Sequence, residues 1–86
     1  MKAMKKINYD DKHDVLYIIL NDMHNTYGDE DDNGIVYMKD GDTDEVKGFI
    51  IYYLKNKIND TEFQNILLEY EINFDIDILP YANNIK

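Results

Sequence analysis

The chain has 86 residues, no cysteine, serine or arginine, and a formal net charge of −9 at pH 7. This length predicts one domain with a small core, and the lack of cysteine excludes disulfides and thiolate metal sites. Two of the commonest nucleophiles, cysteine and serine, are absent, and the negative charge opposes binding to nucleic acid or to an anionic membrane. We therefore expect a non-enzymatic, cytoplasmic protein that binds neither nucleic acid nor membrane.

The first part of the chain, residues 5–54, predicts an antiparallel sheet. Its strands are indicated by β-rich or alternating segments bounded by turn formers. About four strands are predicted, at residues 5–10, 15–20, 35–39 and 45–54. Asp10–Asp14 and Asp40–Asp44 read as hairpin turns, and the segment between the second and third strands reads as a polar connection. The sheet region therefore consists of two hairpins joined by a long loop.

The second part of the chain predicts one helix and an extended segment. Asn59 can cap the helix, and Glu62 can complete a capping box. Apolar residues at a spacing of three or four give the helix a single apolar stripe. These residues are Phe63, Ile66, Leu67 and Tyr70. Residues 72–79 alternate between apolar and polar, which is typical of a strand, and residues 80–86 read as a tail.

Together these elements predict an α+β fold in one domain, residues 1–86. One helix, residues 59–71, packs on one face of a single-layer antiparallel sheet. Alternation along the strands predicts that both faces are apolar, so the face away from the helix needs a cover. The residues predicted on this second face, as an interface, are Val15, Tyr17, Ile19, Ile50, Tyr52 and Leu54.

Leaving this second face in water would forfeit about 1.5–3 kcal/mol for each side chain that could be fully buried. That total is comparable to the whole stability of a small domain. Large exposed apolar patches mark protein contacts. We expect the cover to be another protein or a second copy of the chain, or else the chain's own residues 72–78.

Three short motifs of the sheet region resemble those of a known family. Tyr9-Asp10 is followed by Asp14, Leu16-Tyr17-Ile18 and Leu20, then by Gly34-Ile35, and then by Val46-Lys47-Gly48, which enters an apolar strand. In these motifs and their spacing, the chain is similar to the small bacterial domains of unknown function numbered 2283.

The resemblance implies an antiparallel sheet with a helix against it, and it offers no catalytic residues. It also implies proteins often encoded beside toxin-like genes, for some of which an antitoxin role has been suggested. On this basis Tyr9 and Asp14 bracket a tight turn in which Asp14 bonds backbone amides. The chain departs from the family at Ile19 and Ile50, where many members carry polar residues, and this departure makes the second face apolar.

Acidic residues crowd the stretch from residue 29 to residue 45. Such a run forms either a solvated rim or a surface that attracts a basic partner. The residues assigned to an acidic partner surface are Asp29, Glu30, Asp31, Asp32, Asp42, Asp44 and Glu45.

Part of this stretch matches the first half of a calcium-binding loop. Asp29, Asp31 and Asn33 stand at positions 1, 3 and 5, glycine follows at position 6, and Asp40 stands at position 12. Against a calcium site, Asp40 is shorter than the usual glutamate, and the flanking segments read as strand or loop rather than helix. Calcium bound by these four residues stands as an alternative to a metal-free acidic loop, and no other cofactor is predicted.

These patterns predict a small acidic protein-binding domain that neutralises a basic protein partner, as an antitoxin-like protein or an inhibitor from a mobile element. The apolar second face and the acidic stretch would supply the contacts. Two alternatives stay open at this point. One is a calcium-binding domain, and the other is a homodimeric structural domain with no separate partner.

Overall fold

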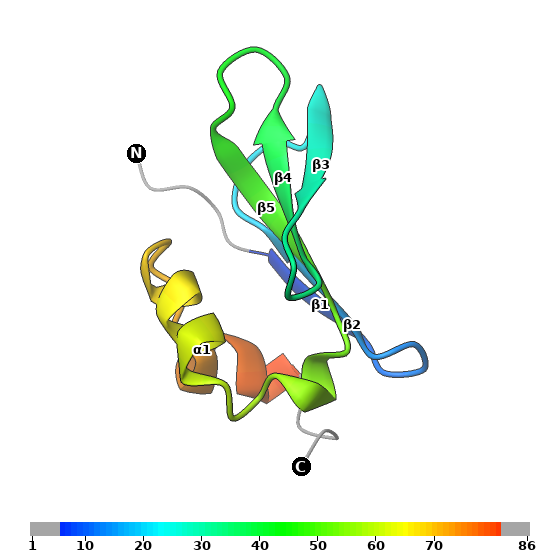
Figure 1. The fold of residues 1–86 in the computed structure, drawn as a ribbon, viewed down its shortest axis with the longest axis vertical. Helices are drawn as coiled ribbons and strands as arrows, with labels where there is room; N and C mark the ends of the chain where they lie inside the picture. Colours follow the sequence, from blue (N-terminus) through cyan, green and yellow to red (C-terminus); the bar gives the residue numbers. More distant parts are fainter. Residues whose placement is uncertain (1–5, 82–86) are drawn as a thin grey trace.

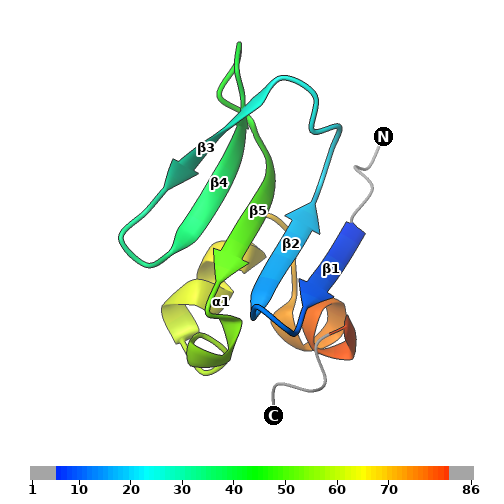
Figure 2. The same cartoon turned by 90° about the vertical axis from the view of Figure 1, so that its right-hand side faces the viewer.

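Five antiparallel strands form one sheet in the computed structural model, which describes residues 6–81. The strands are β1 Lys6–Asp10, β2 Val15–Ile19, β3 Thr26–Glu30, β4 Ile35–Asp40 and β5 Val46–Tyr52. Their order across the sheet is β1-β2-β5-β4-β3, so β5 lies at the centre (Figure 2). The predicted α+β fold with one antiparallel sheet is confirmed. The parts of the predicted domain and tail at residues 1–5 and 82–86 lie outside the described residues.

The fifth strand, β3, lies in the segment that the sequence presented as a polar connection. It pairs with β4 from Thr26 opposite Asp40 to Glu30 opposite Val36. As an outer strand it is largely exposed on both faces, and it therefore lacks the apolar alternation that identifies the other strands. The predicted number of about four strands was too low for this reason.

The helix α1 spans Thr61–Leu68 and is shorter than predicted. Its N-cap is Asp60 rather than Asn59, because the Asp60 carboxylate accepts hydrogen bonds from the backbone amides of Glu62 and Phe63. After Leu68 the chain continues through a turn to a left-handed residue, Glu71, with a φ of 62°. After it the Ile72 amide donates to the Leu67 carbonyl, the bond that closes a Schellman motif.

The predicted strand-like segment at residues 72–79 is helical instead. Residues Phe74–Ile78 form a π-helical turn, capped by the Asn73 side chain, which accepts from the Ile76 amide. The alternating pattern was misleading, because Phe74 and Ile78 are buried four residues apart whereas Ile76 is 70% exposed. A spacing of four is also a helical spacing.

All helical segments pack on the same face of the sheet (Figure 1). They comprise α1, the turn η1 at Leu54–Asn56, the turn η2 at Phe74–Ile78 and the turn η3 at Leu79–Tyr81. The buried core between this helical layer and the sheet consists of Leu16, Ile18, Ile35, Phe49, Ile51, Leu54, Phe63, Leu67, Ile72, Phe74 and Ile78. Rings also meet edge to face, with Phe63 and Phe74 5.9 Å apart between ring centres.

The chain turns sharply at the end of β5. Tyr53 takes a left-handed conformation, with φ 57° and ψ 50°, and its side chain is 66% exposed. Leu54 consequently points into the core and is fully buried. The prediction that placed Leu54 on the second face is therefore wrong, because regular alternation along the strand stops at Tyr52. The Lys57 ammonium group holds this turn by donating to the Tyr52 carbonyl.

The turn between β1 and β2 is tied to the same region. The Tyr9 hydroxyl donates to the Asp14 carboxylate at 2.7 Å, and the Lys55 amide donates to both Asp14 oxygens at 3.2 Å. Burial, followed by the bond to Asp14, raises the pKa of Tyr9. Tyr9 and Asp14 do bracket a tight turn, but the amide that Asp14 bonds belongs to the turn after β5.

We expect Asp14→Ala to lower the free energy of unfolding by about 1–3 kcal/mol, because it leaves the half-buried Tyr9 hydroxyl and the Lys55 amide without their acceptor. Urea unfolding followed by circular dichroism measures this change. Asp14→Asn is the control, since asparagine tolerates a left-handed φ and keeps one acceptor oxygen. If Asp14→Ala lowers the free energy of unfolding no more than Asp14→Asn does, the hydrogen bonds from Tyr9 and Lys55 to Asp14 do not stabilise the fold as we expect.

Candidate functional site

The face of the sheet opposite the helical layer carries apolar side chains on its central strands, and none of the helical segments of residues 6–81 packs on it (Figure 2). We call it the open face. Ile50 on β5 lies directly opposite Tyr17 on β2 and Val36 on β4. Residues that are opposite one another in a sheet point to the same side, so these three side chains share one face. The open face consists of Val15, Tyr17, Ile19, Val36, Met38, Ile50 and Tyr52.

These side chains shield one another only partly. Tyr52 is 39% exposed and Val15 is 6% exposed, whereas Tyr17, Ile19 and Ile50 are half-buried. The buried apolar residues of the C-terminal segment lie in the core on the other side of the sheet. Residues 72–78 therefore do not cover the open face, and that expectation is wrong.

Hollows mark the open face, and two of them involve Tyr17. One has a volume of about 300 Å³ and lies between Asn8, Tyr17 and Ile50, with Met23 at its side. Met23 lies over Gly48, where a Cβ atom would stand 3.2 Å from the Met23 sulfur and 2.5 Å from the Ile18 carbonyl oxygen. The absence of a side chain at Gly48 thus allows the loop before β3 to approach the sheet.

The second hollow has a volume of about 510 Å³ and lies at the β1–β2 turn. It is lined by Asp10, His13, Val15, Tyr17, Tyr52 and Tyr53. The His13 imidazole contacts the Asp10 carboxylate at 2.8 Å, and this contact lowers the pKa of Asp10. Tyrosines concentrate in protein contact sites, because each combines a large apolar area with a polar end.

Val36, Met38 and Met23 belong to the open face or its border but were not assigned to it from the sequence. The signal for the first two was present in Ile35–Lys39, whose residues alternate between the two sides of the sheet. Met23 carried no such signal, since it lies in a loop.

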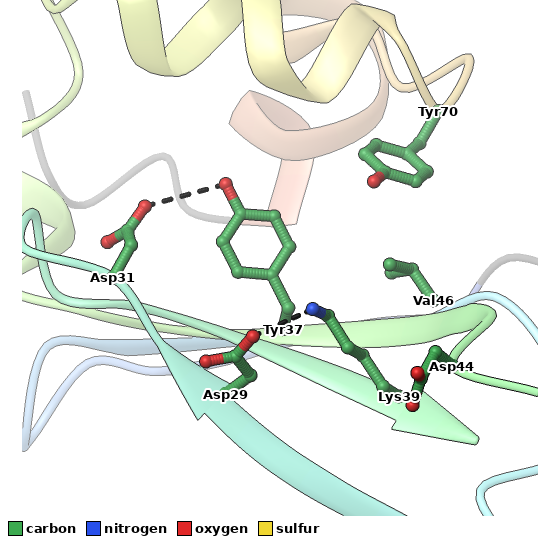
Figure 3. Close-up of a pocket in the computed structure, with 7 residues that line it drawn as sticks. All are labelled: Asp29, Asp31, Tyr37, Lys39, Asp44, Val46 and Tyr70. Atoms are coloured by element: carbon green, nitrogen blue, oxygen red, sulfur yellow. Dashed lines mark hydrogen bonds and ion pairs between the residues drawn. The ribbon is translucent and has the colours of Figure 1, made fainter. Parts of the chain in front are cut away.

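The predicted acidic surface is divided by the sheet. Asp29, Asp31 and Asp44 line a cleft of about 320 Å³ on the side of the helical layer, at the β3–β4 end (Figure 3). Glu30, in contrast, is opposite Val36 and lies on the side of the open face. The remaining predicted members, Asp32, Asp42 and Glu45, are exposed in the turns.

The acidic cleft has a lysine at its floor and aromatic walls. The Lys39 ammonium group lies 2.7 Å from the Asp29 carboxylate, which raises the pKa of Lys39. The Tyr37 hydroxyl donates to Asp31 at 3.4 Å, and burial is the main reason that the pKa of Tyr37 is raised. The ring of Tyr70, from the end of the helical layer, completes the wall (Figure 3).

Aspartates also build the three hairpin turns. The carboxylates of Asp10, Asp31 and Asp40 each accept hydrogen bonds from backbone amides two to four residues further on. Each turn then closes with a residue at positive φ. These closing residues are Asp14, Gly34 and Asp44. Much of the acidic stretch thus has a local role in forming turns.

The four residues of the predicted calcium loop do not converge on one site. Asp31 and Asn33 lie in the β3–β4 turn, Asp29 is paired with Lys39, and Asp40 lies at the far end of β4. At about 3.4 Å per residue, the length of this strand separates the last ligand from the turn by about 17 Å. Within residues 6–81 no group of three or more His, Cys, Asp or Glu side chains is arranged to hold a metal ion.

Comparisons with family models, with curated proteins and with solved structures give no significant match to this chain. In residues 6–81 no helix has the length and apolar character needed to cross a membrane. The open face, the outer strands and the charge distribution are the features of the chain that bear on its function.

We expect stability to fall as the pH is lowered from about 4 towards 2, in part through Asp40. The bond to Lys47 at 2.8 Å, with two backbone amides, lowers the pKa of Asp40 from 3.8 to about 2. Because the folded state holds this proton less tightly than the unfolded state, the contribution is complete above pH 4 and is lost towards pH 2. Urea unfolding at several pH values should show the stability difference between wild type and Asp40→Asn shrinking over this range.

Asp32→Asn provides the control for this measurement, because Asp32 is an exposed carboxylate of the neighbouring turn. Over the same pH range, the stability difference between wild type and Asp32→Asn should change less than that between wild type and Asp40→Asn, because Asp40 is the carboxylate paired with Lys47. A wild-type advantage over Asp40→Asn that does not change with pH would contradict the role of the Asp40–Lys47 pair.

We expect titration with calcium to give no saturable heat in calorimetry, because Asp40 lies at the far end of β4 from Asp29 and Asp31, and Asp29 is already paired with Lys39. Asp29→Ala should leave the calorimetric trace unchanged. Saturable binding that is lost in Asp29→Ala would contradict this geometry and restore the calcium alternative.

Proposed function

We propose that the chain is a non-enzymatic protein-binding domain that places its open face against a basic protein partner. The observation that carries this proposal is the open face itself, an apolar sheet surface left without a covering layer. Antiparallel sheets with one solvated face are normally polar on that face. An apolar one forgoes only part of the roughly 1.5–3 kcal/mol that full burial of an exposed large side chain gives, because Tyr17, Ile19 and Ile50 are already half-buried and Tyr52 is 39% exposed.

The layout of the open face resembles that of a protein interface. Apolar and aromatic side chains occupy its centre, and charged groups lie at its borders. Asp10 on β1 and Glu30 on β3 lie on the same side of the sheet as the open face, each opposite an apolar residue of the next strand. Tyr17 and Tyr52 line the larger hollow and would serve as anchors.

The charge of the chain favours a basic partner. Eighteen acidic residues against nine lysines give the net charge of −9, so a positively charged protein is attracted at long range. A second copy of the chain would be repelled. Homodimerisation through the open face stays an alternative only because the hollow between Asn8, Tyr17 and Ile50 is lined, within residues 6–81, by apolar residues and one asparagine, without carboxylates.

The resemblance to the small bacterial domains numbered 2283 supports a narrower version of the proposal. In that version the chain is antitoxin-like, or an inhibitor from a mobile element, and neutralises its basic partner by covering the partner's working surface. The lack of serine, cysteine and arginine supports a role without catalysis.

Capture of partners from a lysate of the source cell, followed by reconstitution with the purified partner, tests the proposal. We expect wild type to retain a basic protein, and the double variant Ile50→Thr/Tyr52→Thr to bind it at least tenfold more weakly. Threonine keeps the β-branched shape suited to a strand and changes no charge. Calorimetry on the reconstituted pair gives the affinity, and raising the salt concentration should weaken it.

A matched control is the double variant Leu68→Gln/Ile76→Gln, which removes two exposed apolar side chains from the helical side. It should bind as wild type does. Equal loss of binding in both double variants would contradict a role for the open face. Light scattering at micromolar concentration decides the alternative, because a stable dimer that Ile50→Thr/Tyr52→Thr dissociates would favour the homodimer.

A further inference from the structure

The outer strand β3 presents a free edge to the solvent. The Asp31 amide donates to the Ile35 carbonyl, and the Gly41 amide donates to the Asn25 carbonyl. Because hydrogen-bonded positions alternate along an antiparallel pair, Tyr27 and Asp29 also bond β4. The backbone N–H and C=O groups of the intervening residues therefore point away from the sheet. These residues are Thr26, Gly28 and Glu30.

The side chains beside this edge carry negative charge on both faces. Asp29 points to the acidic cleft, where Asp31 and Asp44 also lie, and among residues 6–81 the only cationic group lining the cleft is Lys39 (Figure 3). Glu30 lies on the other side of the strand, and Asp32 is exposed in the turn that follows. An added strand would place alternate side chains against each of these faces.

We propose that the β3 edge pairs with an extended basic segment of the protein partner, as an added antiparallel strand. Main-chain hydrogen bonds to Thr26, Gly28 and Glu30 would give affinity. Lysine or arginine side chains opposite Tyr27 and Asp29 would lie over the acidic cleft and give specificity, since oppositely charged cross-strand neighbours attract. The inference rests on the proposed function only in the basic character of the partner, and it uses a surface separate from the open face.

Charge also favours a basic segment over a second copy of the chain as the strand that pairs with the β3 edge. Edge strands that carry charged side chains resist pairing with themselves. A second copy would bring its own Asp29–Asp32 run and a net charge of −9 to this edge. A basic strand meets the same groups with opposite charge.

A synthetic capped peptide in which lysine alternates with threonine is the probe. In the paired register its lysines lie over the acidic cleft, and its threonine amides bond the β3 edge. We expect saturable binding to the full chain that weakens at least tenfold when the threonine amides are N-methylated, since two or three hydrogen bonds are lost. N-methylation of the lysine amides, which point away from β3, is the matched control and should change affinity by less than about threefold.

Amide hydrogen exchange provides the readout by residue. On saturation with the peptide, the amides of Thr26, Gly28 and Glu30 should become protected, whereas those of Tyr27 and Asp29 are already protected by β4. Equal binding of the two N-methylated peptides, or no new protection, would overturn the proposal. So would protection at these amides without any peptide, because a second copy would then occupy the edge.

The variant Ile50→Thr/Tyr52→Thr separates this inference from the proposed function. It should bind the peptide as wild type does, because the β3 edge is untouched. Loss of peptide binding in this variant would place the peptide on the open face and overturn the edge pairing, while the proposed role of the open face would survive. Conversely, if the variant binds the peptide and still binds the basic protein partner as wild type does, the proposed role of the open face would be overturned, while the edge pairing would survive.

Discussion

The structure depends on one constraint: a single sheet with two apolar faces has covering material for only one of them. The direction of the chain after β5 decides which face is covered. Tyr53 adopts a left-handed conformation, Leu54 turns into the core, and α1 and the C-terminal turns follow on the same side. Ile72, Phe74 and Ile78 complete the core on that side. No helical segment of residues 6–81 is therefore left to pack on the open face.

The acidic residues have two roles in this account. Asp10, Asp31 and Asp40 shape the hairpin turns through bonds to backbone amides, and Asp14 ties the first turn to the turn after β5. The same carboxylates contribute to the negative field around the sheet. A sequence rich in aspartate for local reasons thereby carries a strong net negative charge, and the free edge of β3 lies where that charge is dense.

The sequence predicted the parts of the fold that depend on local chemistry. Apolar runs bounded by turn formers identified four of the five strands, and alternation correctly put Tyr17, Ile19, Ile50 and Tyr52 on one side of the sheet. It missed β3, because an outer strand exposed on both faces has no apolar period. It misread residues 72–79, because apolar residues two apart are also four apart.

The candidate site was harder to predict than the strands. Whether the C-terminal segment covers the second face depends on tertiary packing, which the periodicity of that segment does not encode. Nor did the sequence show that the sheet separates Asp29 and Asp31 from Glu30, since that requires the pairing register of β3 with β4. The left-handed Tyr53 that removes Leu54 from the open face also carried no sequence signal, because tyrosine is not typical of that conformation.

The most direct test of the central claim is methyl NMR with a soluble paramagnetic probe, on the isolated chain diluted to micromolar concentration. Ile19 and Ile50 lie on the open face, whereas Ile18 and Ile51 are fully buried in the core. We expect strong relaxation enhancement at the methyl groups of Ile19 and Ile50, and little at those of Ile18 and Ile51. Equal shielding of all four residues would contradict an uncovered face.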